Sequence, residues 1–319
     1  MPWTSVTPIV LWAVIFIPLA VALWFIQFNS RLTALLFIVA YAAASFFWVM
    51  TVNWSLVWYY LRFVPAVFVL LLIIRQIYLT DGKPFFPRGG VAGWAAFFVA
   101  LLLIAACIPL NARVLESYDY ESYYKEDAIL VLFPLREGMY VITNGGNGIQ
   151  GLGMNDHVRS LFGTPSGTLP NQGYAVDIMK MTVRGTVSEG ILNRDYRKYL
   201  SYNEPVHSPC VGQVVKVVDG IPDVPVLAPG DPLGNYVVLK CFEWYVTLAN
   251  FRSGTFFVKE GDRVGLGQVL GRIGNSGTPS IPHLHMQVNL GSMEADAPAV
   301  PILFELRFSA RNAIYIPQF

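Results

Sequence analysis

Hydrophobic residues are concentrated in the first third of the chain, in four long apolar stretches separated by short polar turns. Each stretch is roughly 20 residues long, the length that a helix needs to cross a hydrocarbon core about 30 Å thick. The pattern therefore predicts four transmembrane helices within residues 1–110. The stretches cover residues 8–28, 32–50, 54–78 and 91–110.

The basic residues of this region mark two of the three turns between the stretches. Arg31 lies in the first turn, and Arg75, Lys83 and Arg88 accompany the third, whereas the second turn has no Lys or Arg. Cytoplasmic loops are enriched in Lys and Arg, so the first and third turns are predicted to be cytoplasmic. Both termini and residues 111–319 are then predicted to lie outside the cytoplasm, on the periplasmic or cell-wall side of a cell membrane.

Beyond residue 110 the pattern changes to short β-branched or aromatic runs separated by Gly, Pro, Asn and Asp. Such alternation is typical of many strands joined by tight turns. Only Arg194–Tyr199 suggests a helix, and it is short. We expect an all-β domain, either an antiparallel β-sandwich or an open barrel. The expected strands include Val211–Val218, Tyr236–Lys240, Tyr245–Leu248, Thr255–Val258, Val269–Ile273 and His283–Val288.

The composition adds two restrictions. The net charge is +1 over 319 residues, so the chain lacks the basic footprint of nucleic-acid-binding proteins and no nucleic-acid partner is expected. Its three cysteines form no C-x-x-C pair, which argues against a thiolate metal site or a redox motif. We expect Cys210 and Cys241 to be buried free thiols, although they would be able to pair in an oxidising compartment.

All four histidines lie in the distal part of the chain, and two of them alternate along a strand-like run. The side chains of His283 and His285 should point to the same face because side chains alternate across a strand. A metal ion would satisfy both imidazoles, but an isolated H-x-H pair is more often a surface or core pair. The glycine-rich Gly145–Gly148 lacks the pattern of a phosphate-binding loop, so we expect an ordinary loop near a binding site.

An ordered series of short motifs surrounds these histidines between residues 130 and 292. The motifs are Phe133-Pro134-Leu135, Gly145-Gly146, Tyr174-Ala175-Val176-Asp177, Pro205-Val206-His207, Gly234-Asn235-Tyr236, Gly261-Asp262, Gly274-Asn275-Ser276-Gly277 and Pro282-His283-Leu284-His285. In this order they resemble the domain of lysostaphin-type zinc metallopeptidases. Together with the apolar stretches, the resemblance divides the chain into four parts: membrane helices in 1–110, a linker in 111–129, a metallopeptidase domain in 130–292 and an extension in 293–319.

The resemblance also implies a zinc ion as cofactor. Carried over motif by motif, Asp177 and His285 would be zinc ligands, and His283 would act in catalysis. Three nitrogen or oxygen ligands leave a fourth position for a water molecule, whose pKa zinc lowers to about 7.

Two positions depart from the family pattern. The family's first ligand falls on Gly173, so we expect His157 to be the third ligand, with His207 as the alternative. Asn250 stands where the family has a histidine that assists catalysis. An asparagine can donate a hydrogen bond to an oxyanion, but it cannot act as an acid or base near neutral pH.

Three functions therefore stay open. The first is a membrane-anchored, extracytoplasmic zinc endopeptidase that cuts peptidoglycan peptides or another extracytoplasmic peptide. The second is an inactive relative that binds wall peptide or a partner as a scaffold, as Asn250 and Gly173 suggest. The third is an accessory subunit packed against other membrane subunits, since four spans exceed what an anchor in the lipid bilayer requires.

Overall fold

The protein is described by a computed structural model that covers residues 3–88, 90–119, 128–158, 170–226, 233–277 and 281–317. These residues form two compact units. The helical unit comprises Ser5–Val52 and Tyr60–Leu115. The distal unit comprises residues 3–4, Asn53–Tyr59 and the described residues from Glu116 onward.

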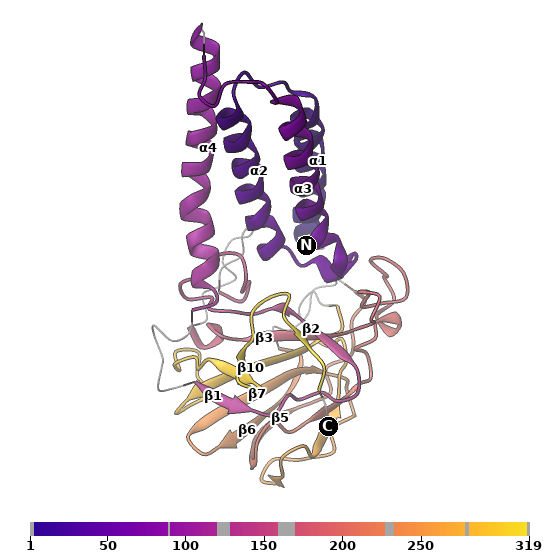
Figure 1. The fold of residues 1–319 in the computed structure, drawn as a ribbon. Coiled ribbons are helices and arrows are strands. Elements are labelled where there is room, and N and C mark those ends of the chain that lie inside the picture. The colour runs from indigo at the N-terminus through magenta and orange to yellow at the C-terminus, as the bar shows by residue number, and fades with distance from the viewer. Residues whose placement is uncertain are drawn as a thin grey trace. The chain divides into compact units, whose positions relative to one another are not determined.

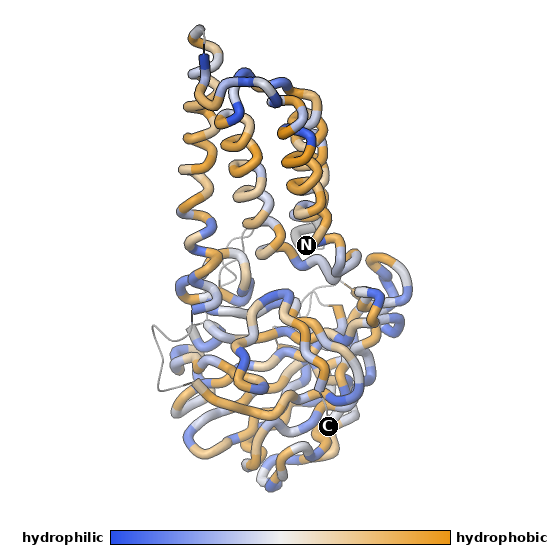
Figure 2. The backbone as a smooth tube through the Cα atoms, viewed as in Figure 1, coloured by the Kyte–Doolittle hydropathy of each residue, from blue (hydrophilic) through white to orange (hydrophobic). Residues whose placement is uncertain are grey.

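The helical unit consists of apolar helices, which are orange along most of their length in Figure 2. They are α1 (Trp3–Phe25), α2 (Arg31–Thr51), α3 (Val64–Leu79) and α4 (Gly90–Glu116). By length and composition, four helical segments of the described chain are able to cross a membrane, as the sequence predicted. Ser30 caps α2, because its hydroxyl accepts a hydrogen bond from the Thr33 amide at 3.2 Å.

Two helix boundaries differ from the predicted ones. The third span was expected as one run from residue 54, but two 3₁₀ turns, η1 (Trp54–Leu56) and η2 (Tyr59–Phe63), precede α3. Pro65 lies in the first turn of α3, where its missing N–H and fixed φ are tolerated. Helix α4 continues to Glu116, into the segment expected as a linker, and residues 120–127 of that segment lie outside the described residues.

The distal unit is all-β, as predicted, and is built on an eight-stranded antiparallel sheet (Figure 1). The strand order is β13-β2-β3-β10-β7-β6-β5-β8. In chain order these strands are β2 (Met139–Asn144), β3 (Val176–Met181), β5 (Gly212–Val218), β6 (Asn235–Cys241), β7 (Trp244–Phe251), β8 (Arg263–Val264), β10 (Leu284–Leu290) and β13 (Ile314–Tyr315).

Two smaller sheets complete the unit. Strand β4 (Pro205–His207) pairs antiparallel with β9 (Val269–Arg272). Strand β1 (Ile129–Val131) runs parallel to β11 (Ile302–Phe304), which pairs with β12 (Arg307–Phe308). The N-terminal and C-terminal ends of the distal unit are therefore joined by backbone hydrogen bonds.

One expected strand is absent and one expected helix is short. Thr255–Val258 is not a strand in the structure, so that prediction was wrong. The Thr255 hydroxyl donates to the Arg252 carbonyl at 2.7 Å, and such side-chain bonds favour a turn over a ladder. The helix expected near Arg194–Tyr199 is a single 3₁₀ turn, η4 (Tyr196–Lys198).

The expectation of two free thiols was also wrong, because Cys210 and Cys241 form a disulfide with Cα atoms 6.3 Å apart. Antiparallel pairing of β5 with β6 sets Gln213 opposite Lys240. This register brings the residues just before β5 next to the end of β6, which the separation along the sequence does not reveal.

Strand β10 separates an apolar face from a polar one. Leu284, Met286 and Val288 belong to the hydrophobic core of the unit. The alternate residues His285, Gln287 and Asn289 are only 4%, 4% and 1% exposed, although they are polar. Buried polar groups need hydrogen-bond partners, so this second face must contain an organised polar network.

The segment Asn53–Tyr59 belongs to the distal unit through hydrogen bonds. The Tyr59 backbone N–H donates to the Gly185 carbonyl at 2.9 Å, and its hydroxyl donates to the Asn312 carbonyl at 2.9 Å. The Trp58 indole N–H donates to the Arg184 carbonyl at 2.6 Å.

Candidate metal centre

A row of polar side chains crosses three neighbouring strands of the large sheet. The register sets Asn144 of β2 opposite Asp177 of β3, and Asp177 opposite His285 of β10. Residues directly opposite each other in antiparallel strands share one face of the sheet. The Asp177 and His285 side chains, which are 108 positions apart in sequence, are therefore brought together by pairing alone.

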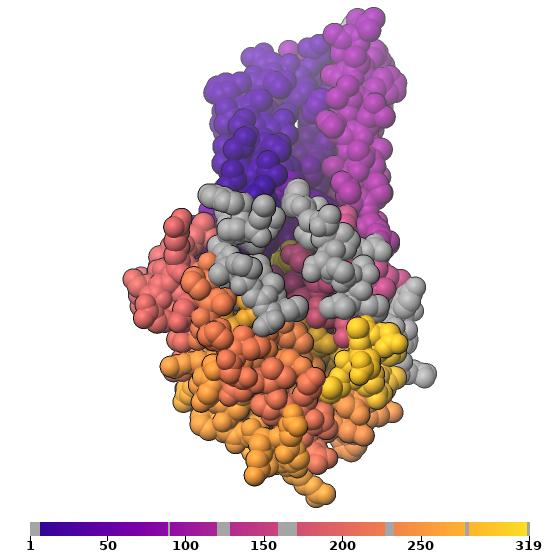
Figure 3. All heavy atoms as spheres, turned by 180° about the vertical axis from the view of Figure 1, so that it is seen from behind, coloured from indigo at the N-terminus to yellow at the C-terminus, as the bar shows by residue number. Residues whose placement is uncertain are grey.

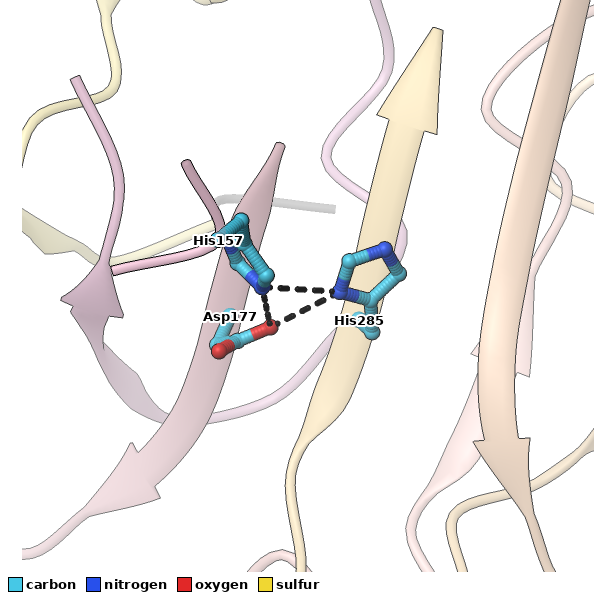
Figure 4. A group of neighbouring side chains, drawn as sticks. All are labelled: His157, Asp177 and His285. Atoms are coloured by element: carbon cyan, nitrogen blue, oxygen red, sulfur yellow. Dashed lines mark hydrogen bonds and ion pairs between the residues drawn. The ribbon is translucent and has the colours of Figure 1, made fainter. Parts of the chain in front are cut away.

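His157 joins this row from the turn that precedes the undescribed residues 159–169. Figure 4 shows the side chains of His157, Asp177 and His285 pointing toward one another. Nε2 of His157 lies 3.2 Å from Oδ1 of Asp177 and 3.1 Å from Nδ1 of His285. Nδ1 of His285 lies 3.0 Å from the same carboxylate oxygen. Three donor atoms for a metal ion thus form a nearly equilateral triangle.

The tautomer of His157 follows from its contact with Asn155. The Asn155 amide nitrogen is surrounded by the carbonyl oxygens of Gly146, Gly173 and Ala175 at 3.0, 3.3 and 3.2 Å, which fixes the orientation of this amide. Its oxygen then faces Nδ1 of His157 at 2.9 Å and must accept a hydrogen bond from the Nδ1–H group. Nε2 of His157 is left with a lone pair directed at the triangle.

A second amide lies near the same ring without changing this assignment. The Asn144 amide nitrogen is 3.1 Å from Nδ1 and 3.4 Å from Nε2 of His157. An atom nearly equidistant from both ring nitrogens lies beyond the lone-pair direction of either. Its hydrogen bond goes instead to Oδ2 of Asp177 at 3.2 Å.

The tautomer of His285 is set by a chain of amides along the polar face of β10. The Asn289 amide donates to the backbone carbonyl of Asn171 at 2.7 Å, so its oxygen faces and accepts from the Gln287 amide at 3.0 Å. The Gln287 oxygen consequently faces Nε2 of His285 at 3.1 Å and accepts a hydrogen bond from the Nε2–H group. Nδ1 of His285 is then the nitrogen with a free lone pair.

The network thus directs two nitrogen lone pairs and one carboxylate oxygen at a common point. Three acceptors at 3.0–3.2 Å repel one another unless a cation lies between them. Ligands at about 2.0–2.1 Å from a tetrahedral zinc ion are separated by about 3.3 Å, which agrees with the triangle. The set of one oxygen and two imidazole nitrogens fits zinc, with a position left for water.

The protonation equilibria favour the same charge states. Burial raises the pKa of the Asp177 carboxyl, but His157 and His283 lower it more, so that this pKa lies well below its ordinary value. Burial lowers the pKa of His285, and the nearby His157 adds to the effect although Asp177 opposes it. An ionised carboxylate and a neutral imidazole are the forms that bind metal.

Residues 198–297 match the sequence model of peptidase family M23. The distal unit contains a peptidase M23 domain. The match includes His283 and His285, whereas His157, Asp177 and Asn144 lie before its first residue. No curated protein sequence shows significant similarity to the chain.

Several solved structures resemble part of the chain. Lysostaphin in solution is 20% identical, with a TM-score of 0.27 and coverage of 39% of each chain. A zinc-containing peptidase from Vibrio cholerae is 18% identical, with a TM-score of 0.32, over 52% of this chain and 37% of the other. The catalytic domain of lysostaphin from Staphylococcus simulans is 21% identical, with a TM-score of 0.27, over 40% of this chain and 77% of the other. The chain therefore spans less than two fifths of the length of the first two relatives.

His283 lies beside the triangle formed by His157, Asp177 and His285. Its Nδ1–H donates to the Ile281 carbonyl at 2.7 Å, so Nε2 faces Oδ1 of Asp177 at 3.4 Å. Burial lowers the pKa of His283, but the Asp177 charge and hydrogen bonds raise it more, so the net shift is upward. The structure brings this expected catalytic residue beside the three expected ligands.

The other residues considered from the sequence lie elsewhere. His207 is buried on β4, and its backbone N–H donates to the Pro134 carbonyl; the metal-capable group found among the described residues does not include it. Asn250 is buried with φ of 67°, and its amide donates to the carbonyls of Ser276 at 2.9 Å and Leu233 at 3.4 Å. Asn250 is thus bonded to backbone, and no contact with the triangle is seen in the described chain.

The amides that orient the three candidate ligands were not anticipated from the sequence. Gln287 and Asn289 carried a readable signal, because they continue the polar alternation that starts at His283. Asn144 and Asn155 carried none, since only the folded chain shows which ligand each contacts. The Gly145–Gly148 loop supports one of them, as the Gly146 carbonyl accepts from Asn155.

Proposed function

We propose that this protein is a membrane-embedded zinc metallopeptidase whose M23 domain acts outside the cytoplasm, on a cell-wall peptide or another extracytoplasmic peptide. The observation that carries the proposal is the convergence of two imidazole lone pairs and one carboxylate oxygen, each oriented by its own carboxamide. The family match supports the reaction class, because M23 peptidases are zinc-dependent.

The chain's own residues would divide the work at this site. His157, Asp177 and His285 would hold the metal. Bound zinc would polarise the scissile carbonyl and lower the pKa of a water to about 7. The Nδ1–H group of His283 donates to the Ile281 carbonyl. The raised pKa of His283 favours a second proton on Nε2. A protonated Nε2 can donate to the oxyanion or to the leaving amine.

Two features support action outside the cytoplasm. Basic residues mark the first and third turns between the apolar helices, and because cytoplasmic loops are enriched in Lys and Arg, this pattern supports a position of the M23 domain on the opposite side of the membrane. The Cys210–Cys241 disulfide is of a kind that persists in oxidising compartments and is rare in the cytosol.

The test is zinc content and peptide hydrolysis of the full chain in detergent. We expect about one zinc per chain in the wild type, its loss in His285→Ala, and its retention in His207→Ala, which removes a histidine outside the triangle. Hydrolysis of peptidoglycan-derived peptides should disappear with a chelator and in His283→Ala. A folded wild type without zinc would refute the metal site.

A second candidate function is a zinc-bearing domain that binds wall peptide without cutting it. Asn250 favours it, because this residue cannot act as an acid or base and its amide is bonded to backbone carbonyls. Zinc binding together with saturable peptide binding, but without hydrolysis that depends on His283, would favour this candidate over the peptidase.

A further inference from the structure

The C-terminal segment that follows the M23 match contributes a buried arginine beneath the metal centre. Part of this segment lies on the surface seen in Figure 3, in yellow, yet the Arg311 side chain is only 5% exposed. We infer that Arg311 is a positioning residue that keeps His157 and Asp177 in their metal-binding orientation. The inference rests on the proposed function, since it concerns the same centre.

The Arg311 guanidinium binds two segments at once. Its acceptors are the Thr143 carbonyl at 2.9 Å, the Gly153 carbonyl at 2.7 Å, the Asn144 side-chain oxygen at 3.0 Å and the Asp156 carboxylate at 2.6 Å. The first and third belong to the end of β2, and the others to the turn that carries His157. A planar fork of five N–H donors can make this set of bonds, whereas a lysine ammonium cannot reach all of it.

The bond of Arg311 to Asn144 orients the amide that donates to Asp177. The Asn144 oxygen accepts from Arg311 and from the Asp156 backbone N–H at 2.7 Å, so the nitrogen must face Oδ2 of Asp177. This bond occupies Oδ2 and leaves Oδ1 for the metal. Without the guanidinium, only the Asp156 backbone N–H holds the Asn144 oxygen, so the amide is less firmly oriented toward Oδ2 of Asp177.

The bonds of Arg311 to Gly153 and Asp156 fix the turn that carries His157. Asp156 and Gly153 flank Asn155, whose oxygen sets the His157 tautomer. Arg311 therefore orients two of the three ligands, although it contacts none of them in the described bonds. Residues that orient metal ligands typically contribute 10–100-fold to metal affinity.

A purely structural arginine would anchor the C-terminal segment and leave the metal affinity unchanged. The closest comparison in the same segment is Arg307, which is 55% exposed and pairs with Glu305 at 3.0 Å. Its guanidinium also lies 4.4 Å from the centre of the Tyr315 ring. Arg307→Ala is thus the matched control. It also removes a hydrogen-bonded arginine, but Arg307 has no contact with β2 or the 153–157 turn in the described structure.

The experiment measures the zinc dissociation constant of the full chain in detergent by chelator competition. We expect Arg311→Ala to raise this constant about 10–100-fold and Arg307→Ala to leave it within twofold. Millimolar guanidinium chloride should restore part of the affinity of Arg311→Ala, and an equal concentration of sodium chloride should not. Asn144→Ala should weaken binding as well, and guanidinium should not rescue it.

The outcomes separate the inference from the proposed function. Wild-type protein without zinc overturns both. Wild type with zinc, together with a folded Arg311→Ala of unchanged affinity, overturns only the positioning role. If Arg311→Ala does not fold, the folded Asn144→Ala variant decides, because it leaves the arginine in place and removes the amide that links it to Asp177. Unchanged zinc affinity in that variant overturns the inference.

Discussion

The amide of Gln287 should control how tightly the centre binds zinc, because it decides which nitrogen of His285 carries the proton. Gln287→Met preserves the length of the side chain and removes both of its hydrogen bonds, to His285 at 3.1 Å and to Asn289 at 3.0 Å. Without an acceptor at Nε2, the His285 proton can move to Nδ1 and bond Oδ1 of Asp177, 3.0 Å away. That tautomer competes with the metal for both atoms.

The expected magnitudes follow from burial. Each buried polar atom left without a partner costs about 1–3 kcal/mol, and Gln287→Met leaves two of them, on His285 and Asn289. The metal-free protein should therefore unfold at a lower temperature. Loss of an orienting residue weakens metal binding about 10–100-fold, which corresponds to about 1.4–2.7 kcal/mol of binding free energy.

The assay is chelator competition on the full chain in detergent, with thermal unfolding of the metal-free form measured in parallel. Gln213→Met is the matched control, because Gln213 lies on β5 and makes one exposed bond to the Gly261 carbonyl. It should change neither quantity appreciably. A folded Gln287→Met protein that binds zinc as tightly as the wild type would refute the tautomer argument.

Three further changes test other parts of the distal unit. Asn250→Ala should lower stability by about 2–4 kcal/mol, because the buried Ser276 carbonyl loses its donor and a φ of 67° suits asparagine better than alanine; calorimetry checks this, and zinc affinity should stay the same. Burial, aided by the charge of Arg136, lowers the pKa of His207 below 6.5, so the folded protein takes up a proton at this residue less readily than the unfolded chain. The contribution of His207 to stability should therefore be complete above pH 6.5 and decrease below it. The decrease should be smaller in His207→Gln. Replacing Cys210 and Cys241 by alanine should cost about 3–4 kcal/mol for a separation of 31 residues, and thermal unfolding in reductant should show the same loss in the wild type only.

Local pattern was enough to predict the elements of the fold. Continuous apolar runs of sufficient length predicted the spans, and alternation predicted the strands around His283–Val288 and Tyr245–Leu248. The pattern failed for the expected strand at Thr255–Val258, where a side-chain hydrogen bond of Thr255 replaces backbone pairing. It also set the start of the third helix too early, because α3 begins only next to Pro65.

The site was less accessible to sequence reasoning because it depends on register. The choice between His157 and His207 could not be made from spacing, since neither lies on a strand next to Asp177 in sequence. The pairing of β3 with β10 and the position of the 155–158 turn decide which side chains meet. The same limit applies to the disulfide and to Arg311, whose partners are 155 and more positions away. The roles assigned to these residues stay predictions until zinc binding is measured.

The bonds of Tyr59 to Gly185 and Asn312 restrict how the two halves of this chain can be exchanged during evolution. A recombination event that replaced the helical half by another helical region would take Trp58 and Tyr59 with it. The carbonyls at 184, 185 and 312 would then lose the donors they now share with that segment. A new helical region would be retained only if it supplied equivalent donors, so the residues at 58 and 59 should covary with the loops that accept their hydrogen bonds.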